Sequence, residues 1–266
     1  MLSFDPWHLM PFVKQASDAI LAVYRSDFGH TLKADHSPLT EADQNSQKIL
    51  MDGLNRVAPG VPVISEEAEQ IVYAVRKDWE NYFLVDPLDG TREFVDKIPE
   101  FAINIAFIHR QRPVFGLIHS PNENLTYIAE QGSGAFLLGE KKVRLPRVEH
   151  NGDEVRVLLS RTDFSSELDS LMGRIGNHSV TRCGSSLKFC RIAEGAADFY
   201  PRLKGSMEWD TASGAILVEE TGGLMCDLSG APIKYNREDP LNPPFFCMSA
   251  HFLQTHPDWK DLLSGL

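Results

Sequence analysis

The segment Tyr82–Thr91 constrains the fold of this chain more than any other. It begins with an apolar run, which predicts a buried strand, and it ends in the turn Asp86–Thr91. A proline stiffens the turn between its two acids, and a glycine allows backbone to approach a ligand closely. Two carboxylates at the end of a buried strand can hold a hard divalent cation. The same residues also suit an ordinary acidic turn, so other segments must decide between these interpretations.

Three other segments add polar residues of the same kind. Glu66 and Glu67 follow a short apolar strand, and Asp210 lies near the start of a helical pattern that ends at Gly222-Gly223. The third segment, Lys33–Asp43, is a loop that runs into a helix, with Thr40 and Asp43 spaced as a capping box. Each has an ordinary explanation as a helix start or an N-cap. Together with Asp86 and Asp89 they form an acidic set of the kind that binds two or more Mg²⁺ ions.

These segments together resemble the lithium-sensitive, Mg²⁺-dependent phosphomonoesterase superfamily that includes the inositol monophosphatases. The resemblance rests on three motifs in the same order, which are Ser65-Glu66-Glu67, Asp86–Thr91 and Trp209-Asp210 with the helix that follows. It extends from Lys33 to Gly223. Within the superfamily the chain is similar to the bacterial 3'(2'),5'-bisphosphate nucleotidases, through Ala34–Thr40, Gly90–Phe94, Gly184–Cys190 and Ala196–Arg202.

Two small departures separate the chain from the usual pattern of that branch. Arg92 stands where a lysine is more usual, and Ser213 stands where an alanine is more usual. Neither position is a metal ligand in the resemblance. The departures therefore bear on specificity and leave the expected chemistry in place.

The hydrophobic patterns alone predict a mixture of α and β structure. Asp5-Pro6 is typical of a helix start, and further helices are predicted after Thr40 and from Glu67. The predicted strands and helices after Asp89 cover residues 101–107, 113–118, 125–129, 135–138, 155–159, 185–193, 198–200, 211–220, 224–226 and 245–249. The first four of these are expected to form a meandering antiparallel sheet, and the later ones alternate strand and helix.

The resemblance implies a fold of mixed α+β and α/β class, a layered αβαβα sandwich with the active site between two halves. We expect an N-terminal α+β half over residues 1–145 that carries most metal ligands. A C-terminal α/β half over residues 154–266 would carry Asp210 and the substrate specificity. The charged segment 141–153 is the candidate linker between them.

The resemblance also implies the metal ligands and the catalytic residues. Glu66, Asp86 and the Leu88 carbonyl would hold one Mg²⁺, Asp86, Asp89 and Asp210 would hold a second, and Glu66 would help to position a third. Phosphate monoesters hydrolyse extremely slowly unaided, so charge on the transferred group has to be neutralised. A metal-activated water would attack in line, and Thr91, oriented by Asp43, would position this water and relay its proton.

Residues for substrate binding follow from the same resemblance. The amides of Gly90 and Thr91 would hold the phosphate, and Asp210 would stabilise the departing ribose oxygen. Ser185, Lys188 and Arg202 belong to the second half, where a cation favours a substrate with a second phosphate.

The leading hypothesis is a Mg²⁺-dependent enzyme that hydrolyses the 3'-phosphate of adenosine 3',5'-bisphosphate, giving AMP and phosphate, in connection with sulfate assimilation. The alternative is the same chemistry on inositol monophosphate, phosphoadenylyl sulfate or a sugar bisphosphate. A third hypothesis is a ligand-sensing protein that has lost catalysis. The expected ligands and the Thr91–Asp43 pair are all present, which disfavours the third.

Composition limits the partners of the protein. The net charge is 26 − 37 = −11, which disfavours a nucleic acid polymer as ligand and suits a site whose field is reversed by bound cations. The longest apolar run, from Phe101 to Ile108, is interrupted by Asn104 and falls short of a membrane span. No signal sequence is recognisable, so we expect a cytoplasmic protein, with peripheral attachment at an inner membrane as an open alternative. The four cysteines are expected to be reduced core thiols, and the protein a monomer or a homodimer.

Overall fold

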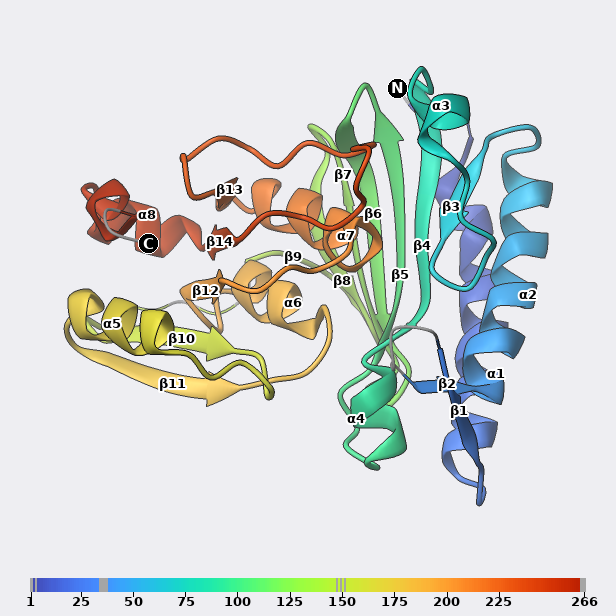
Figure 1. Cartoon of the computed structure of the whole chain (residues 1–266), viewed down its shortest axis with the longest axis horizontal. Coiled ribbons are helices and arrows are strands. Elements are labelled where there is room, and N and C mark those ends of the chain that lie inside the picture. The colour runs from blue at the N-terminus through green and yellow to red at the C-terminus, as the bar shows by residue number, and fades with distance from the viewer. Residues whose placement is uncertain are drawn as a thin grey trace.

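The computed structural model describes residues 2, 4–33, 38–146, 148, 150 and 152–263. These residues form five layers, with two helices, a large sheet, two more helices, a smaller sheet and an outer pair of helices (Figure 1). The predicted αβαβα sandwich is therefore confirmed. Residues 34–37 of the loop that leads to Thr40, and residues 147, 149 and 151 of the expected linker, lie outside the described residues.

The larger sheet has seven strands in chain order within the described residues. Its first two strands run parallel and all later neighbours run antiparallel, as the predicted meander requires. The strands are β3 (Val63–Ser65), β4 (Asn81–Asp89), β5 (Ala102–His109), β6 (Arg112–Ser120), β7 (Leu125–Glu130), β8 (Gly134–Leu138) and β9 (Lys142–Arg144).

The smaller sheet, again counted over the described residues, has five strands in the order β11-β10-β12-β14-β13. β10 pairs in parallel with β11 and β12, whereas β14 pairs antiparallel with β12 and β13. The strands are β10 (Val155–Leu159), β11 (His178–Arg182), β12 (Phe199–Arg202), β13 (Leu224–Asp227) and β14 (Phe245–Met248).

The longer helices pack on both sheets (Figure 1). The first pair covers the outer face of the larger sheet, the second lies between the sheets, and the third covers the outer face of the smaller sheet. In that order they are α1 (Met10–Tyr24) and α2 (Glu41–Val57), α6 (Leu187–Glu194) and α7 (Glu208–Glu219), and α5 (Ser166–Ile175) and α8 (Ala250–Thr255).

The remaining elements are short. They are the 3₁₀ helices η1 (Pro6–Leu9) and η2 (Trp259–Leu263), the strands β1 (His30–Leu32) and β2 (Pro38–Thr40), and the helices α3 (Tyr73–Arg76) and α4 (Thr91–Val95). The predicted start at Asp5-Pro6 is confirmed, because the Asp5 carboxylate accepts from the Trp7 amide at 3.0 Å. The capping box of Thr40 and Asp43 is also present at the start of α2.

Two sequence predictions are wrong. The helix expected from Glu67 does not form, because Glu66 and Glu67 lie in a turn where both bind Lys33, and the chain becomes helical only at Tyr73. Residues 142–144, expected in the linker, form β9 and pair with β8. The ammonium of Lys142 and the guanidinium of Arg144 lie over the Phe136 ring, so this charged strand is held by cation–π contacts.

Apolar packing joins the layers. One cluster of buried residues contains side chains from the larger sheet, from α6 and α7, and from the smaller sheet. Cys190, Cys226 and Cys247 are buried and unbridged and Cys183 is half-buried, which confirms the prediction of reduced thiols. In the described part of the chain, each helix is too short or too polar to cross a bilayer.

Candidate active site

A cavity of about 340 Å³ opens between the end of β4 and the layer of α6 and α7. Its walls come from segments that are far apart in the sequence. Every residue predicted as a metal ligand or as a substrate contact lines it, namely Glu66, Asp86, Leu88, Asp89, Gly90, Thr91, Ser185, Lys188, Arg202 and Asp210. The predicted catalytic residue Asp43 lies behind this wall and contacts Thr91.

The turn at the end of β4 is held rigidly. The register on β5 shifts between Asp86 and Asp89, so β4 carries a bulge there. The Leu88 amide donates to Asp86 Oδ1 at 3.0 Å, and the Ser46 hydroxyl of α2 donates to the Pro87 carbonyl at 2.7 Å. Gly90 has a φ of 87°, in the left-handed region that favours glycine. These contacts hold both carboxylates at the cavity.

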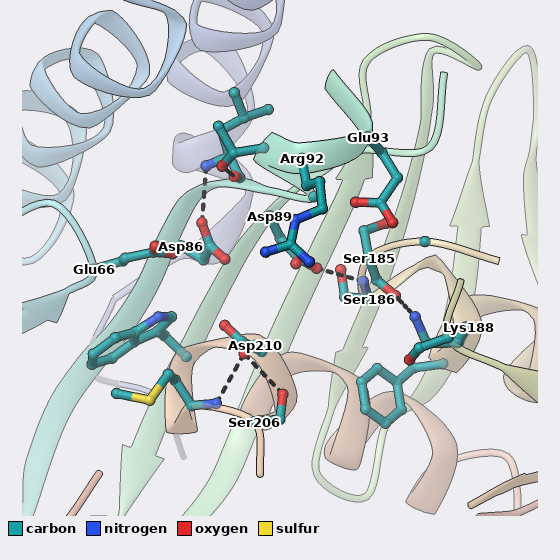
Figure 2. A pocket seen from close by; sticks show the side chains of 18 of the residues that line it. Glu66, Asp86, Asp89, Arg92, Glu93, Ser185, Ser186, Lys188, Ser206 and Asp210 are labelled. Atoms are coloured by element: carbon teal, nitrogen blue, oxygen red, sulfur yellow. Dashed lines mark hydrogen bonds between the residues drawn. The ribbon is translucent and has the colours of Figure 1, made fainter. Parts of the chain in front are cut away.

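Three carboxylates meet at one point of the cavity. Oxygens of Glu66, Asp86 and Asp210 all lie within 4.8 Å of one another. Each comes from a different element, since Glu66 follows β3, Asp86 belongs to β4 and Asp210 to the first turn of α7. Figure 2 shows these side chains and Asp89 around the same space.

The carboxylates raise one another's pKa. Burial, followed by the charges of Glu66 and Asp89, raises the pKa of Asp86 well above its ordinary range. Burial and the charges of Asp89 and Glu66 raise the pKa of Asp210 to about 8. An all-oxygen donor set whose members repel one another fits a hard divalent cation. The residues present therefore suit the ions that the resemblance implies.

Neighbouring groups orient two of these carboxylates. Asp210 Oδ2 accepts from the Ser206 hydroxyl at 2.8 Å and from the Met207 amide at 2.9 Å. The Lys33 ammonium donates to Glu66 at 2.6 Å and also to Glu67. Burial raises the pKa of Glu66, and this ammonium partly opposes the shift. This role of Lys33 could not be predicted from its position at the start of a loop, 33 residues before Glu66.

Thr91 and Asp43 form the predicted pair. The Thr91 hydroxyl lies 3.1 Å from Asp43 Oδ1 and 2.9 Å from the Leu88 carbonyl oxygen. The other Asp43 oxygen accepts from both the amide and the hydroxyl of Thr40. Burial raises the pKa of Asp43, while the hydrogen bonds from Thr40 and Thr91 act against the shift. One residue thus caps α2 and holds a hydroxyl at the cavity.

Two cations line the opposite wall. Lys188 is buried, and its ammonium donates to the carbonyl oxygens of Ser185 at 2.6 Å and Cys183 at 3.1 Å. The Arg202 guanidinium donates to the Ser160 hydroxyl at 2.8 Å and lies 3.8 Å from an Asp163 oxygen. Its Nε has no hydrogen-bond partner among the described residues.

Sequence reasoning missed several residues around the cavity. Arg92, Glu93 and Ser206 line it, and Arg92 was noted only as a departure from a pattern. Glu100 accepts from the Gly184 amide at 2.6 Å and pairs with Arg161. Asn104 was noted only because it interrupts an apolar run, which was in fact a signal that a buried strand carries a polar group.

A second group of possible ligands lies elsewhere, where His150, Asp198 and His251 approach one another. The Asp198 carboxylate accepts from the Arg156 amide and from two guanidinium nitrogens of the same residue. His150 Nε2 lies 3.0 Å from the Glu154 carbonyl oxygen. Because the charge of Asp198 is already balanced, we do not assign a metal to this group.

Comparison with known proteins places the chain among its relatives. The family model described as "Inositol monophosphatase family" matches residues 8–260. The Escherichia coli K12 protein named 3'(2'),5'-bisphosphate nucleotidase CysQ is 40% identical over 235 residues, which cover 87% of this chain and 94% of that protein. The Haemophilus influenzae protein of the same name is 34% identical over 237 residues, 88% of each chain.

Solved structures agree with these relatives. The crystal structure of CysQ from Bacteroides thetaiotaomicron superposes with a TM-score of 0.82 at 33% identity, covering 92% of this chain and 96% of that chain. An inositol monophosphatase from Thermotoga maritima superposes with a TM-score of 0.77 at 23% identity, covering 96% and 94%, and supports the fold. The chain therefore belongs to the inositol monophosphatase family.

Proposed function

We propose that the protein is a metal-dependent phosphomonoesterase that hydrolyses the 3'-phosphate of adenosine 3',5'-bisphosphate, giving AMP and phosphate. One observation carries the proposal. The cavity has a group of carboxylates on one side, at Glu66, Asp86 and Asp210, and the cations Lys188 and Arg202 on the other. Such a site suits a substrate with two separate phosphates. The nucleotidase relatives at 33–40% identity support the same reaction.

In this proposal the site binds two to three Mg²⁺ ions. Their ligands are the Leu88 carbonyl and the carboxylates of Glu66, Asp86, Asp89 and Asp210. When bound, Mg²⁺ supplies positive charge for the phosphoryl oxygens and makes a water more acidic. Oxygen ligands of this kind are those that Mg²⁺ prefers.

The proton from the attacking water passes through the Thr91–Asp43 pair. Thr91 Oγ1 accepts a hydrogen bond from the water while it donates its own proton to Asp43 Oδ1, 3.1 Å away. Burial makes Asp43 a stronger base than an exposed aspartate, which suits it to receive that proton. The Gly90 and Thr91 amides face the transferred phosphate.

Substrate selection is assigned to the second wall. Lys188 uses two of its three N–H groups on carbonyl oxygens, so one donor is left for an anion. A phosphate that is not transferred would accept from Lys188 and Arg202. Ser185 lines the same cavity and is assigned to substrate binding. A cytoplasmic location and a role in sulfate assimilation complete the proposal.

The test compares phosphate release from adenosine 3',5'-bisphosphate and from inositol 1-phosphate, each with Mg²⁺ and with EDTA. We expect release from the nucleotide to exceed that from inositol 1-phosphate, to disappear with EDTA and to be inhibited by Li⁺. Faster release from inositol 1-phosphate would retain the metal chemistry and overturn the substrate assignment. Release that persists in EDTA would overturn the metal site.

A further inference from the structure

Asn104 is a fully buried amide next to the acidic cluster, and the mechanism above does not use it. It lies in β5, directly opposite Asp86 of β4. A buried amide is costly unless its donors and acceptor are matched. The Asn104 carbonyl accepts from the Ser186 hydroxyl at 2.7 Å, and its NH₂ group donates to Asp89 Oδ2 at 3.3 Å.

A third hydrogen bond closes these contacts into a ring. The Ser186 backbone amide donates to the same Asp89 oxygen (Figure 2). Asp89, Asn104 and Ser186 therefore each contact the other two. Among the described residues, the hydrogen bonds to the Asp89 side chain fall on Oδ2, so Oδ1 is left for another ligand.

The ring joins the two walls of the cavity. Asp89 belongs to the carboxylate side, whereas Ser186 precedes α6 and follows Ser185, whose φ of 50° is unusual for a residue with a side chain. The Gly184 amide donates to the side chain of Glu100, which precedes β5, at 2.6 Å, so the loop Gly184–Ser186 is held at both of its ends. Asp89 and Asn104 each bind the other two members through their side chains, whereas Ser186 uses its hydroxyl for Asn104 and its backbone amide for Asp89.

We propose that Asn104 is a positioning residue, whose amide fixes the Asp89 carboxylate for metal binding and ties it to the substrate loop Gly184–Ser186. The inference rests on the proposed role of Asp89 as a metal ligand. Groups that hydrogen-bond to a ligand fix its orientation, and their loss costs about 10- to 100-fold in metal affinity. Through Asn104 and Ser186, an ordered Asp89 also holds the loop that carries Ser185 and leads to Lys188.

The main test is Asn104→Leu, which keeps the approximate shape and removes both side-chain hydrogen bonds. Mn²⁺ is the probe, because it takes the same oxygen ligands and its free concentration can be read by electron paramagnetic resonance. We expect the full-length variant to bind Mn²⁺ about 10-fold more weakly or worse. We also expect a higher KM for the nucleotide, because the substrate loop loses its side-chain contact with β5.

Thr126→Val is the matched control for general damage to the sheet. Thr126 is buried in β7 and bonds to His119 at 2.8 Å, away from the cavity. We expect it to lower the thermal stability as Asn104→Leu does while Mn²⁺ affinity and KM stay unchanged. Unchanged Mn²⁺ affinity in folded Asn104→Leu would overturn the proposal. An equal loss of Mn²⁺ affinity in Asn104→Leu and Thr126→Val would also overturn it.

A double-mutant cycle tests the ring itself. Ser186→Ala removes the hydroxyl and keeps the backbone amide, so we expect a smaller loss of Mn²⁺ affinity than for Asn104→Leu. Since the hydroxyl acts through Asn104, the double variant should bind Mn²⁺ as Asn104→Leu does. Losses that multiply would show that the two side chains act independently and would overturn the ring.

The readout separates this inference from the substrate assignment. If the wild-type protein does not hydrolyse the nucleotide but Asn104→Leu still weakens Mn²⁺ binding, the positioning role stands and the proposed substrate fails. Asp89→Asn should weaken Mn²⁺ binding at least as much as Asn104→Leu. If Asp89→Asn leaves Mn²⁺ binding unchanged, the metal-ligand basis fails and the positioning role fails with it.

Discussion

Asp86 has only 1% of its surface exposed, and the charges of Glu66, Asp89 and Asp210 all act on its carboxyl group. The charged form is unfavourable in such surroundings unless a cation is close. Because its pKa is raised in the folded protein, the folded state binds a proton more readily than the unfolded chain, so the stability of the metal-free protein rises as the pH falls through the folded pKa toward the ordinary value of 3.8. Metal binding therefore requires a charged carboxylate at Asp86, whereas the stability of the metal-free protein favours a neutral group there.

The first prediction concerns Asp86→Asn. In EDTA at pH 7 we expect the variant to melt at a higher temperature than the wild type, since a buried repelling charge is gone. Added Mg²⁺ should raise the melting temperature of the wild type and not that of the variant. Phosphate release by the variant should be about 100-fold or more below that of the wild type. Thermal denaturation with and without Mg²⁺ measures this. Asp52→Asn, at an exposed pair with Arg56, is the control and should change little.

The second prediction concerns His119, which is buried in β6 and bonds to Thr126. Burial lowers its pKa from 6.5 to about 4, so between these values the unfolded chain binds a proton that the folded protein excludes. Its contribution to stability is therefore complete above pH 6.5 and is lost as the pH falls toward 4. Urea unfolding at pH 7 and pH 5 should differ by about 2 kcal/mol more in the wild type than in His119→Asn. An equal difference in both proteins would contradict this account.

At the scale of elements, the junction of β4 and α4 depends on a close backbone approach. Gly90 has a φ of 87°, and a Cβ there would lie 2.7 Å from the Glu100 carbonyl oxygen. Gly60, in the turn after α2, has a similar φ of 82° but open space around the same position. A comparison of Gly60 with Gly90 therefore separates the strain of a left-handed backbone from the steric cost of a Cβ close to Glu100.

The third prediction compares Gly90→Ala with Gly60→Ala. We expect Gly60→Ala to lower the free energy of unfolding by about 1 kcal/mol, which is the cost of a left-handed backbone for a residue with a Cβ. Gly90→Ala should lose more, because Glu100 must move, and its phosphate release should fall as well. Urea titration and the phosphate assay measure the two effects. Equal stability losses with full activity in both variants would show that the approach at Gly90 is unimportant.

Elements with local signals could be predicted from the sequence. The capping box of Thr40 and Asp43 is encoded within four residues, and the structure has it. The helix expected at Glu67 failed because its residues have acids but no apolar side to bury, and Lys33, 34 positions away, binds the carboxylate instead. Helix α5 was not predicted, although Leu168, Leu171, Met172 and Ile175 recur at helical spacing and Ser165 caps it.

At the scale of the whole molecule, one buried cluster connects both sheets through α6 and α7. Tyr82 of the larger sheet and Phe245 of the smaller sheet belong to the same cluster, and both are fully buried. The division into a half over residues 1–145 with most metal ligands and a half over residues 154–266 with the substrate specificity stays a prediction. Packing of this kind predicts that the halves unfold together.

The fourth prediction is a single calorimetric transition on heating. We expect Phe245→Ala to lower the temperature of that one transition, because the loss of a buried ring weakens packing shared by both sheets, at a cost of about 3–5 kcal/mol. Differential scanning calorimetry of both proteins in EDTA is the measurement. Two separable transitions, with only one shifted by the substitution, would contradict shared packing.

Long-range contacts set the limit of sequence reasoning at this scale. The resemblance supplied the ligands and the Thr91–Asp43 pair, whose members are 48 positions apart and meet in the structure. It supplied nothing for Asn104 and Ser186, 82 positions apart, because a polar residue in an apolar run does not indicate which distant residue it will bond to. His150 and His251 likewise approach only in three dimensions.

Because β4 has a bulge, the placement of Asp86 and Asp89 on one face depends on the number of residues between them. In a regular strand, side chains alternate between faces, so residues three positions apart would point to opposite sides of the sheet. The register pairs Asp86 with Asn104 and Asp89 with Ala102, so four residues of β4 span three of β5. The extra residue reverses the alternation once and brings both carboxylates to one face. An odd number of inserted or deleted residues between them would separate the pair, even if every side chain of the motif were kept.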